Sequence, residues 1–463
     1  MSASPGTAAA AQGSSAYVYL AATVAATAGL LFGFDIAVIN GAIIFLQNQF
    51  HLSDFQTEIA TSSLLFGCIF GSSLAGWLTD HLGRRRVLML TGLGFALSAI
   101  GAALPHALWQ FVAARFVGGL AIGAGSLLAP LYIAEVAPAQ NRGRLVSLNQ
   151  MAIVVGILIA YLVNWGLSFF GAESWRWMFA VAAIPSIALF IAVFFVPESP
   201  RWLVEAGRSA EASEVLRRIN GPLVASEELK NIEAAVAQET GTISELFRPG
   251  FRRALWIAIS LAILQQITGM NTVLFYGALI FRNQVGNESA STAIFANVVI
   301  GLVNALATLV ALWLMDRAGR RPLLLISTGV MALSQAGLGA AFLSRTPSAA
   351  IVLTMMLFCV AAFAVGLGPG FWVLVAEIFP TRIRGRAISI STVCLWSAST
   401  LLTMTFLTLT HALSPTGAFL IYGGFCVITF AIVWFFVPET KGRTLEEIEQ
   451  MWLVPASRSN GQK

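Results

Sequence analysis

The chain has 463 residues, of which 57% are apolar and only 11% are charged, and its formal net charge is +5. A soluble domain carries roughly 25% charged residues, so this composition, with a mean hydropathy of +0.80, excludes a soluble, disordered, collagen-like or nucleic-acid-binding protein. One spanning helix needs about 20 apolar residues. The chain is therefore long enough for ten to twelve spans of an α-helical membrane protein.

Twelve apolar segments follow one another along the chain, and their continuous hydrophobicity favours helices over the alternating strands of a membrane barrel. The expected spans are 17–46, 57–79, 86–104, 108–136, 145–170, 176–196, 253–281, 290–314, 322–344, 349–377, 386–410 and 416–437. Residues 1–16 contain no Lys or Arg, so we read them as a cytosolic tail and not as a secretory signal.

The basic residues are distributed unequally between the two sets of loops. Loops after the even-numbered spans and the C-terminal tail contain Arg84, Arg85, Arg86, Arg142, Arg144, Arg317, Arg320, Arg321, Arg382, Arg384, Arg386, Lys441 and Arg443. The opposite loops contain only Arg176, Arg282 and Arg345. Because cytoplasmic loops are enriched in Lys and Arg, we expect both termini in the cytoplasm of a multi-pass protein of the inner or plasma membrane.

Residues 197–252 are polar and charged, which predicts a cytoplasmic helical linker between bundles at 17–196 and 253–437, with a cytosolic tail at 438–463. Three short motifs recur at offsets of about 240 residues, which indicates an internal repeat. They are Gly83-Arg84-Arg85 and Gly319-Arg320-Arg321, Glu135 and Glu377, and Pro197-Glu198 and Pro438-Glu439. Two parallel six-helix repeats predict a pseudo-two-fold axis along the membrane normal and a cavity between the halves, as alternating access requires.

These motifs resemble those of the sugar porter family of the major facilitator superfamily, over about residues 25–450. The loop motif is represented by 80–86 and 316–321, and the sugar-branch signatures by Trp175-Arg176-Trp177-Met178-Phe179, Pro197-Glu198-Ser199-Pro200-Arg201-Trp202-Leu203, Gln265-Gln266-Ile267-Thr268-Gly269-Met270-Asn271 and Pro438-Glu439-Thr440. The chain departs from the pattern at His81, where the family often has Arg or Lys, and at Leu312, where the first copy has Gly76.

Two ionisable residues are placed well inside the predicted spans, Asp35 in the first and Arg115 in the fourth. An intramembrane charge costs several kcal/mol, and both residues lie at about the same depth, so we expect them to pair. The pair is either a static brace or a proton switch. Burial disfavours the charged carboxylate, whereas a nearby guanidinium favours it, so opening the pair changes proton affinity. The resemblance implies that proton-coupled members carry Asp at the position of Asp35 and passive members often carry Asn.

A sugar site needs amides or hydroxyls that donate and accept hydrogen bonds, and aromatic rings that contact the apolar faces of the sugar. The spans contain such residues at Gln150, Gln265, Gln266, Asn271, Asn304 and Trp372, and the resemblance places these at the sugar-binding positions of the family. We add Phe32 and Trp396 to the pocket and expect Phe275 and Tyr276 to form an outer gate. Ala364, Leu395 and Ser399 depart from the polar residues that relatives often carry there. A lone Gln in a span otherwise often binds helices together.

Matching charged residues at the cytoplasmic ends of the two halves predict a charge network that holds the halves together in the outward-facing state. Its members are Asp80, Arg84, Arg85, Glu135, Arg142, Glu198, Asp316, Arg320, Arg321, Glu377, Arg384 and Glu439. Topology alone explains the arginines but not the glutamates at equivalent places.

The sequence therefore predicts a monomeric secondary transporter that imports a monosaccharide, a hexose or a pentose, by proton symport. A passive facilitator of the same fold and a sugar sensor that does not transport remain alternatives. We expect no enzyme activity, no cofactor other than the coupling proton, and no metal, because the four cysteines lack metal-ligand spacing and no nucleophile or acid pair is evident. The glycine-rich stretch 366–370 lies inside a span, which indicates close packing and a helix break.

Overall fold

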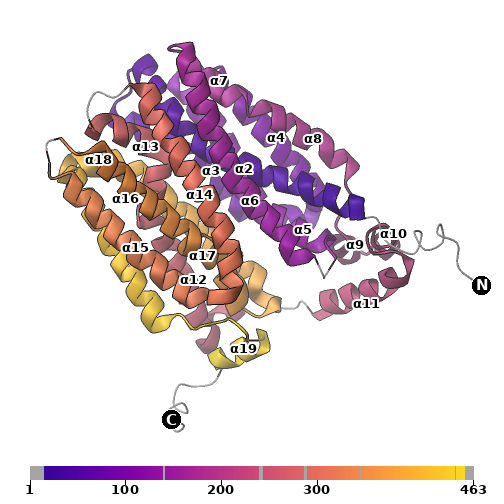
Figure 1. Ribbon diagram of the computed structural model, residues 1–463. Coiled ribbons are helices and arrows are strands. Elements are labelled where there is room, and N and C mark those ends of the chain that lie inside the picture. The colour runs from indigo at the N-terminus through magenta and orange to yellow at the C-terminus, as the bar shows by residue number, and fades with distance from the viewer. Residues whose placement is uncertain are drawn as a thin grey trace, which may run out of the picture. The chain divides into compact units, whose positions relative to one another are not determined.

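The computed structural model describes residues 15–138, 141–238, 243–285, 289–344, 346–443 and 445–453, and all regular structure in these ranges is helical (Figure 1). The first half of the described chain forms seven helices, of which the last two together make the sixth predicted span. They are α2 (Ser15–Phe50), α3 (Asp54–Leu82), α4 (Arg84–Ala103), α5 (Leu108–Val136), α6 (Arg142–Leu167), α7 (Ser174–Ala180) and α8 (Ala183–Ala192).

The linker region is helical, as predicted, and contains three short helices, α9 (Pro200–Glu205), α10 (Ser209–Asn220) and α11 (Pro222–Gln238). Ser199 caps α9, because its hydroxyl accepts a hydrogen bond from the backbone N–H of Trp202 and Pro200 occupies the first helical position. Glycine at 221, with φ of 79°, separates α10 from α11.

The second half is interrupted more often than the sequence predicts. Its elements are α12 (Pro249–Ile267), α13 (Met270–Val285), α14 (Ala290–Ala318), α15 (Arg320–Ala341), α16 (Ala349–Ala362), the π-helical turn η4 (Phe363–Leu367), α17 (Gly368–Ile378), α18 (Thr381–Phe436) and α19 (Leu445–Leu453). The seventh span, predicted as continuous, breaks at Gly269, where φ is 81°. The predicted break in the tenth span is the turn η4 ahead of Pro369. α18 contains spans 11 and 12, which meet at Ser414 with φ of 64°.

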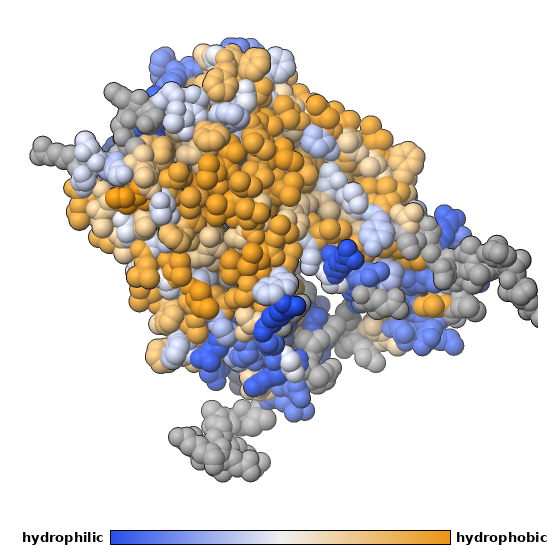
Figure 2. Space-filling model, in the orientation of Figure 1, coloured by the Kyte–Doolittle hydropathy of each residue, from blue (hydrophilic) through white to orange (hydrophobic). Residues whose placement is uncertain are grey.

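Eleven helical segments in the described chain are long and apolar enough to cross a membrane, and the segment Arg382–Phe436 contains two spans, in agreement with the twelve predicted. Large apolar side chains on these helices are exposed, for example Trp109 at 69% and Leu333 at 75%. In Figure 2 hydrophobic residues cover the side of α6, whereas hydrophilic residues gather over α9–α11 and over α19. This surface is suited to lipid along the spans and to water at the linker helices.

Contacts divide the chain into two compact units, one made of residues up to 45 and 63–239, the other of 46–62 and 240 onward. The linker predicted at 197–252 is thus shared, because most of its helical part packs with the first unit and its last residues pack with the second. The end of α2 and the beginning of α3 group with the second unit.

Glycines allow helices of the first unit to approach closely. A Cβ atom at Gly67 on α3 would clash with the carbonyl of Phe116 on α5, and one at Gly33 on α2 would clash with the carbonyl of Ile153 on α6. Small residues at helix crossings replace the missing hydrophobic driving force inside a bilayer with close van der Waals contact.

We predict that Gly67→Ala lowers the unfolding temperature of the purified protein in detergent, because overpacking costs about 1–3 kcal/mol. Gly76→Ala is the matched control on the same helix, since a Cβ atom there has no neighbour within 4 Å. The control should keep or raise the unfolding temperature, as alanine favours helices. Equal effects of both variants in a thermal-shift assay would contradict this account of the α3–α5 contact.

Candidate functional site

The structure brings Asp35 on α2 and Arg115 on α5 together as a buried ion pair. Arg115 Nη1 donates to Asp35 Oδ1 at 2.5 Å, and Arg115 Nη2 donates to the backbone carbonyl of Asp35 at 2.7 Å. The exposed fractions of the two side chains are 7% for Asp35 and 0% for Arg115. The guanidinium therefore holds both the side chain and the backbone of α2 at this point.

An aromatic wall, formed by Phe111, Trp175 and Phe179, lies beside the pair. Arg115 Cζ is 5.2 Å from the centroid of the Phe179 ring, which Phe111 contacts edge-on at 5.3 Å between centroids. Trp175 is fully buried and approaches Phe111 at 6.2 Å. The motif 175–179 thus supplies the apolar surroundings that strengthen an ion pair relative to one in water.

A second polar cluster, the amide cluster, lies in the second unit and consists of Gln265, Gln266, Asn271 and Ser399. Asn271 Nδ2 donates to Gln266 Oε1 and, at 3.0 Å, to Ser399 Oγ. Gln266 Nε2 donates to Gln265 Oε1 at 3.5 Å. The break at Gly269 turns α13 relative to α12 and so allows Asn271 to reach back to Gln266.

The π-helical turn η4 anchors one end of the amide cluster. Gln265 Nε2 donates to the carbonyls of Leu367 and Gly368, at 3.0 and 3.2 Å. Ser327 Oγ on α15 accepts the backbone N–H of Leu367 at 3.1 Å. Irregular helical turns leave carbonyls without the normal intrahelical partner, and here a predicted pocket residue binds them.

The other predicted pocket residues are placed as follows. Asn304 on α14 and Trp396 on α18 are buried, and Trp372 on α17 is half-buried, with its ring 5.1 Å from that of Phe371. Gln150 and Phe32 are half-buried in the first unit, whereas the amide cluster lies in the second.

Ser399 departs from the polar residues that relatives often carry there, yet its hydroxyl is part of the amide cluster. Its position one helical turn after Trp396 is the sequence signal that predicts a shared face.

Both predicted gate residues, Phe275 and Tyr276 on α13, are buried. The Tyr276 hydroxyl donates to the carbonyl of Thr403 on α18 at 2.9 Å, and its ring lies 5.0 Å from that of Phe406. The gate assignment stays a prediction, but these contacts show which helix α13 would have to leave if the gate opens.

Glu58, near the beginning of α3, is a further buried charge that the sequence did not predict. Its side chain is fully buried and accepts hydrogen bonds from the backbone N–H and the Oγ1 of Thr408, both at 2.8 Å. One turn before it, Asp54 pairs with His411 at 2.6 Å. Glu58 lies at the edge of a predicted span, where an acidic residue is typical of an exposed helix start, so only packing reveals its burial.

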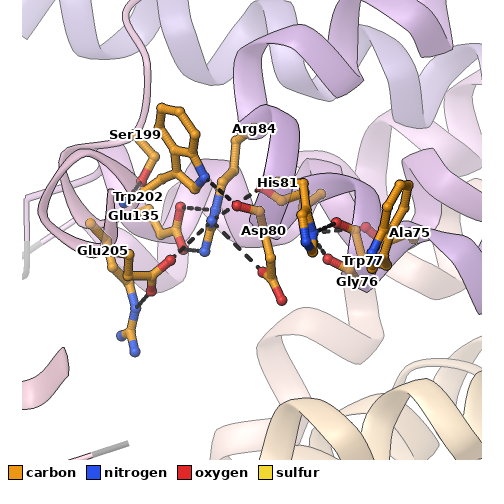
Figure 3. A network of polar contacts seen from close by, with 12 residues as sticks. Ala75, Gly76, Trp77, Asp80, His81, Arg84, Glu135, Ser199, Trp202 and Glu205 are labelled. Carbon is orange, nitrogen blue, oxygen red and sulfur yellow. Dashed lines mark hydrogen bonds and ion pairs between the residues drawn. The ribbon is translucent and has the colours of Figure 1, made fainter. Parts of the chain in front are cut away.

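Several residues of the predicted charge network form a cluster around Arg84 in the first unit (Figure 3). Arg84 Nε and Nη2 donate to the two carboxylate oxygens of Glu135 at 3.0 and 3.1 Å, and Nη1 donates to Glu205 at 3.2 Å. Asp80 is more distant, with its Oδ1 atom 4.0 Å from Arg84 Nη1. Glu205 was not predicted, although it lies only two residues after the 197–203 motif.

The second unit repeats the arrangement around Arg320, which donates from Nη2 and Nε to Glu377 at 2.9 and 3.2 Å. Glu198 and Glu439, expected to pair with arginines, instead accept backbone N–H groups at the beginning of α4 and of α15. A carboxylate at a helix N-terminus is favoured by the orphan N–H groups and the helix dipole.

Four further arginines of the predicted network lie outside these two clusters. Arg85 and Arg321 donate from Nη2 to the carbonyls of Phe194 and Trp434, at 2.7 and 2.6 Å. Arg142 Nη2 lies 3.9 Å from Glu228 Oε1, and Arg384 Nε donates to the carbonyl of Phe379 at 3.3 Å.

The side chain of Asp316 lies outside the described residues. The contacts named here join residues within one unit, so the expectation that the network closes the two halves stays a prediction.

The fold and these clusters define the class of protein, a polytopic transporter built from two repeated helical bundles. The profile of the family described as "Sugar (and other) transporter" matches residues 21–452. The arabinose-proton symporter of Bacillus subtilis is 38% identical over 94% of this chain and 95% of its own, and the D-xylose-proton symporter of Escherichia coli is 36% identical over 95% and 97%. The chain therefore belongs to the sugar porter family of the major facilitator superfamily.

The solved structures agree. The proton:xylose symporter XylE bound to 6-bromo-6-deoxy-D-glucose has a TM-score of 0.81 with 35% identity and covers 95% of this chain and 99% of its own. A partially occluded inward-open form of XylE from E. coli has a TM-score of 0.84 with 34% identity, covering 93% and 100%. The protein is a membrane transporter and not an enzyme, as predicted.

We predict that Arg84→Ala destabilises the protein by about 3–5 kcal/mol, because it leaves the buried Glu135 carboxylate without its partner. The double variant Arg84→Ala/Glu135→Ala should be less destabilised than the two single changes combined, as a thermal-unfolding cycle will show. Arg142→Ala is the control, since its side chain is 45% exposed and such pairs are worth about 0–1 kcal/mol. If the stability losses of the two single variants simply add up in the double variant, Arg84 and Glu135 do not interact and this account of the cluster is wrong.

Proposed function

We propose that this protein imports a monosaccharide, a pentose or a hexose, by proton symport, working as a monomer in the cell membrane with both termini in the cytoplasm. The buried ion pair between Asp35 and Arg115 is the observation that carries the proposal. The relatives named for proton-coupled transport of arabinose and xylose support it, because they match nearly the full chain.

The ion pair provides a chemical basis for coupling. Arg115 bonds both the carboxylate and the backbone carbonyl of Asp35, so it ties α5 to α2 while Asp35 is charged. A proton from outside neutralises Asp35 and weakens the Coulombic part of that tie. By linkage, any state in which the tie is broken binds the proton more tightly. Protonation thereby favours the conformation that carries the sugar inward.

The amide cluster and the indoles of Trp372 and Trp396 supply the chemistry for a neutral sugar. Amides and the Ser399 hydroxyl both donate and accept hydrogen bonds, which suits a ring of hydroxyl groups. The side chains of Gln265, Gln266 and Asn271 already bond one another, so sugar hydroxyls would replace or extend these bonds. Asn304 completes the proposed site in the second unit, and Gln150 and Phe32 stay predicted pocket residues of the first unit.

A passive facilitator is the main alternative, and the buried carboxylate opposes it, because downhill transport needs no titrating group in the membrane. Uptake of radiolabelled D-xylose, L-arabinose and D-glucose into proteoliposomes, with and without an inward proton gradient, tests the proposal. Accumulation that requires the gradient supports symport, and mere equilibration of sugar under both conditions would establish the facilitator. Binding with no transport at all would establish the sensor.

We predict that Asp35→Asn abolishes accumulation against a sugar gradient but preserves sugar exchange at equilibrium. The amide keeps the shape of the carboxylate and removes the titrating group. Glu214→Gln is the control, since Glu214 pairs with Arg218 on the exposed surface of α10. Uphill uptake by the Asn variant would refute Asp35 as the proton site.

We predict that Gln265→Ala and Asn271→Ala weaken sugar binding about 5- to 30-fold, because each lost hydrogen bond to a neutral group costs about 1–2 kcal/mol. Trp372→Ala should also weaken binding, through loss of ring contact. Asn297→Ala on α14 is the amide control, because its Nδ2 donates to the carbonyl of Ala293 in its own helix. Unchanged affinity by calorimetry in the three site variants would remove the amide cluster from the sugar site.

A further inference from the structure

The hydroxyl of Ser98 on α4 is buried close to the ion pair and has no hydrogen-bond partner in the described part of the protein. A serine inside a helix normally relieves this by donating to a carbonyl of the preceding turn. Ser334 occupies the equivalent place in the repeat, as far beyond Gly319 as Ser98 is beyond Gly83. Its hydroxyl donates to the carbonyl of Val330 at 2.8 Å.

Gly118 on α5 shows what the Ser98 hydroxyl faces. A Cβ atom at position 118 would clash with Ser98 Oγ and would lie 2.9 Å from Asp35 Oδ2. The two oxygen atoms therefore face the same space, and glycine leaves that space to them. Asp35 Oδ1 is bound by Arg115, and Oδ2 makes no hydrogen bond to the described residues.

The groups that face Asp35 from the neighbouring helices are few. Arg115 reaches it from α5, and the buried thiol of Cys68 on α3 lies in the electrostatic field of both residues of the pair. From α4 comes the neutral Ser98, and from α7 comes the ring of Phe179, whose centroid lies 5.2 Å from Arg115 Cζ. Ser98 is therefore the one uncharged hydroxyl that these contacts place beside the free carboxylate oxygen.

We propose that Ser98 is a positioning residue for the coupling proton, which Asp35 carries on Oδ2 toward the Ser98 hydroxyl, and that Gly118 keeps this approach open. The inference rests on the proposed proton symport. The step is a single proton transfer: a hydronium ion breaks one O–H bond and becomes water, the O–H bond at Oδ2 forms, and the charge of the carboxylate is lost. On release the same proton passes to a water molecule, which becomes hydronium again. The Ser98 oxygen accepts a hydrogen bond from the neutral carboxyl group and so stabilises the protonated state.

The test compares Ser98→Ala, Ser98→Thr and the matched control Ser334→Ala. Proton-driven D-xylose and L-arabinose uptake is measured in proteoliposomes over a range of external pH, together with equilibrium exchange. Loss of the acceptor weakens proton binding, so the pH of half-maximal uptake should fall by about half to one unit in Ser98→Ala, which is about a three- to tenfold loss of proton affinity. Ser98→Thr, which keeps the hydroxyl, and Ser334→Ala should keep the wild-type midpoint.

Gly118→Ala tests the same approach in a second way, because the added methyl group would stand between Ser98 Oγ and Asp35 Oδ2. The pH of half-maximal uptake should therefore also fall in this variant. A midpoint unchanged in Ser98→Ala, or an equal shift in Ser334→Ala, would overturn the role of Ser98 even if uptake rates drop. Failure of the symport proposal is distinguishable, since the wild-type protein would then show no gradient-dependent accumulation of either sugar.

Discussion

The ion pair between Asp35 and Arg115 is the interaction on which the first unit depends, because neither charge is tolerable alone inside a membrane. Arg115 is fully buried and donates hydrogen bonds to the side-chain carboxylate and to the backbone carbonyl of Asp35. Phe179 covers one side of it, and Gly118 brings α5 close to α2 and α4. The same few residues therefore hold the helices together, form the buried ion pair and are the ones proposed for proton coupling.

The two repeats carry equivalent charged clusters at the ends of their helices and differ in their interiors. Arg84 with Glu135 and Arg320 with Glu377 are equivalent pairs, and Glu198 and Glu439 cap equivalent helices. The first unit buries a charge pair, whereas the second buries amides and hydroxyls around Asn271. A duplicated framework therefore holds a buried charge pair in one unit and a cluster of neutral amides and a hydroxyl in the other.

Irregular backbone in the second unit has a specific consequence for polar groups. The break at Gly269 and the π-helical turn η4 expose carbonyls and redirect side chains toward the amide cluster. Non-helical backbone at membrane depth is tolerated where it is buried in protein or lines a cavity.

Hydropathy and charge placement in the sequence were sufficient for the helical class, the twelve spans and the pairing of Asp35 with Arg115, because each follows from the cost of placing polar groups in lipid. The repeat followed from three short motifs that recur at offsets of about 240 residues. The tertiary structure decided which neighbours each side chain meets. In the folded protein the Ser399 hydroxyl belongs to the amide cluster, and Glu58 is buried against α18. Glu198 and Glu439 accept hydrogen bonds from backbone N–H groups. The Ser98 hydroxyl lies beside Asp35 without a hydrogen-bond partner among the described residues. Hydropathy averages over a whole helix, whereas hydrogen bonding depends on the rotation of each helix about its axis, which only packing against other helices determines.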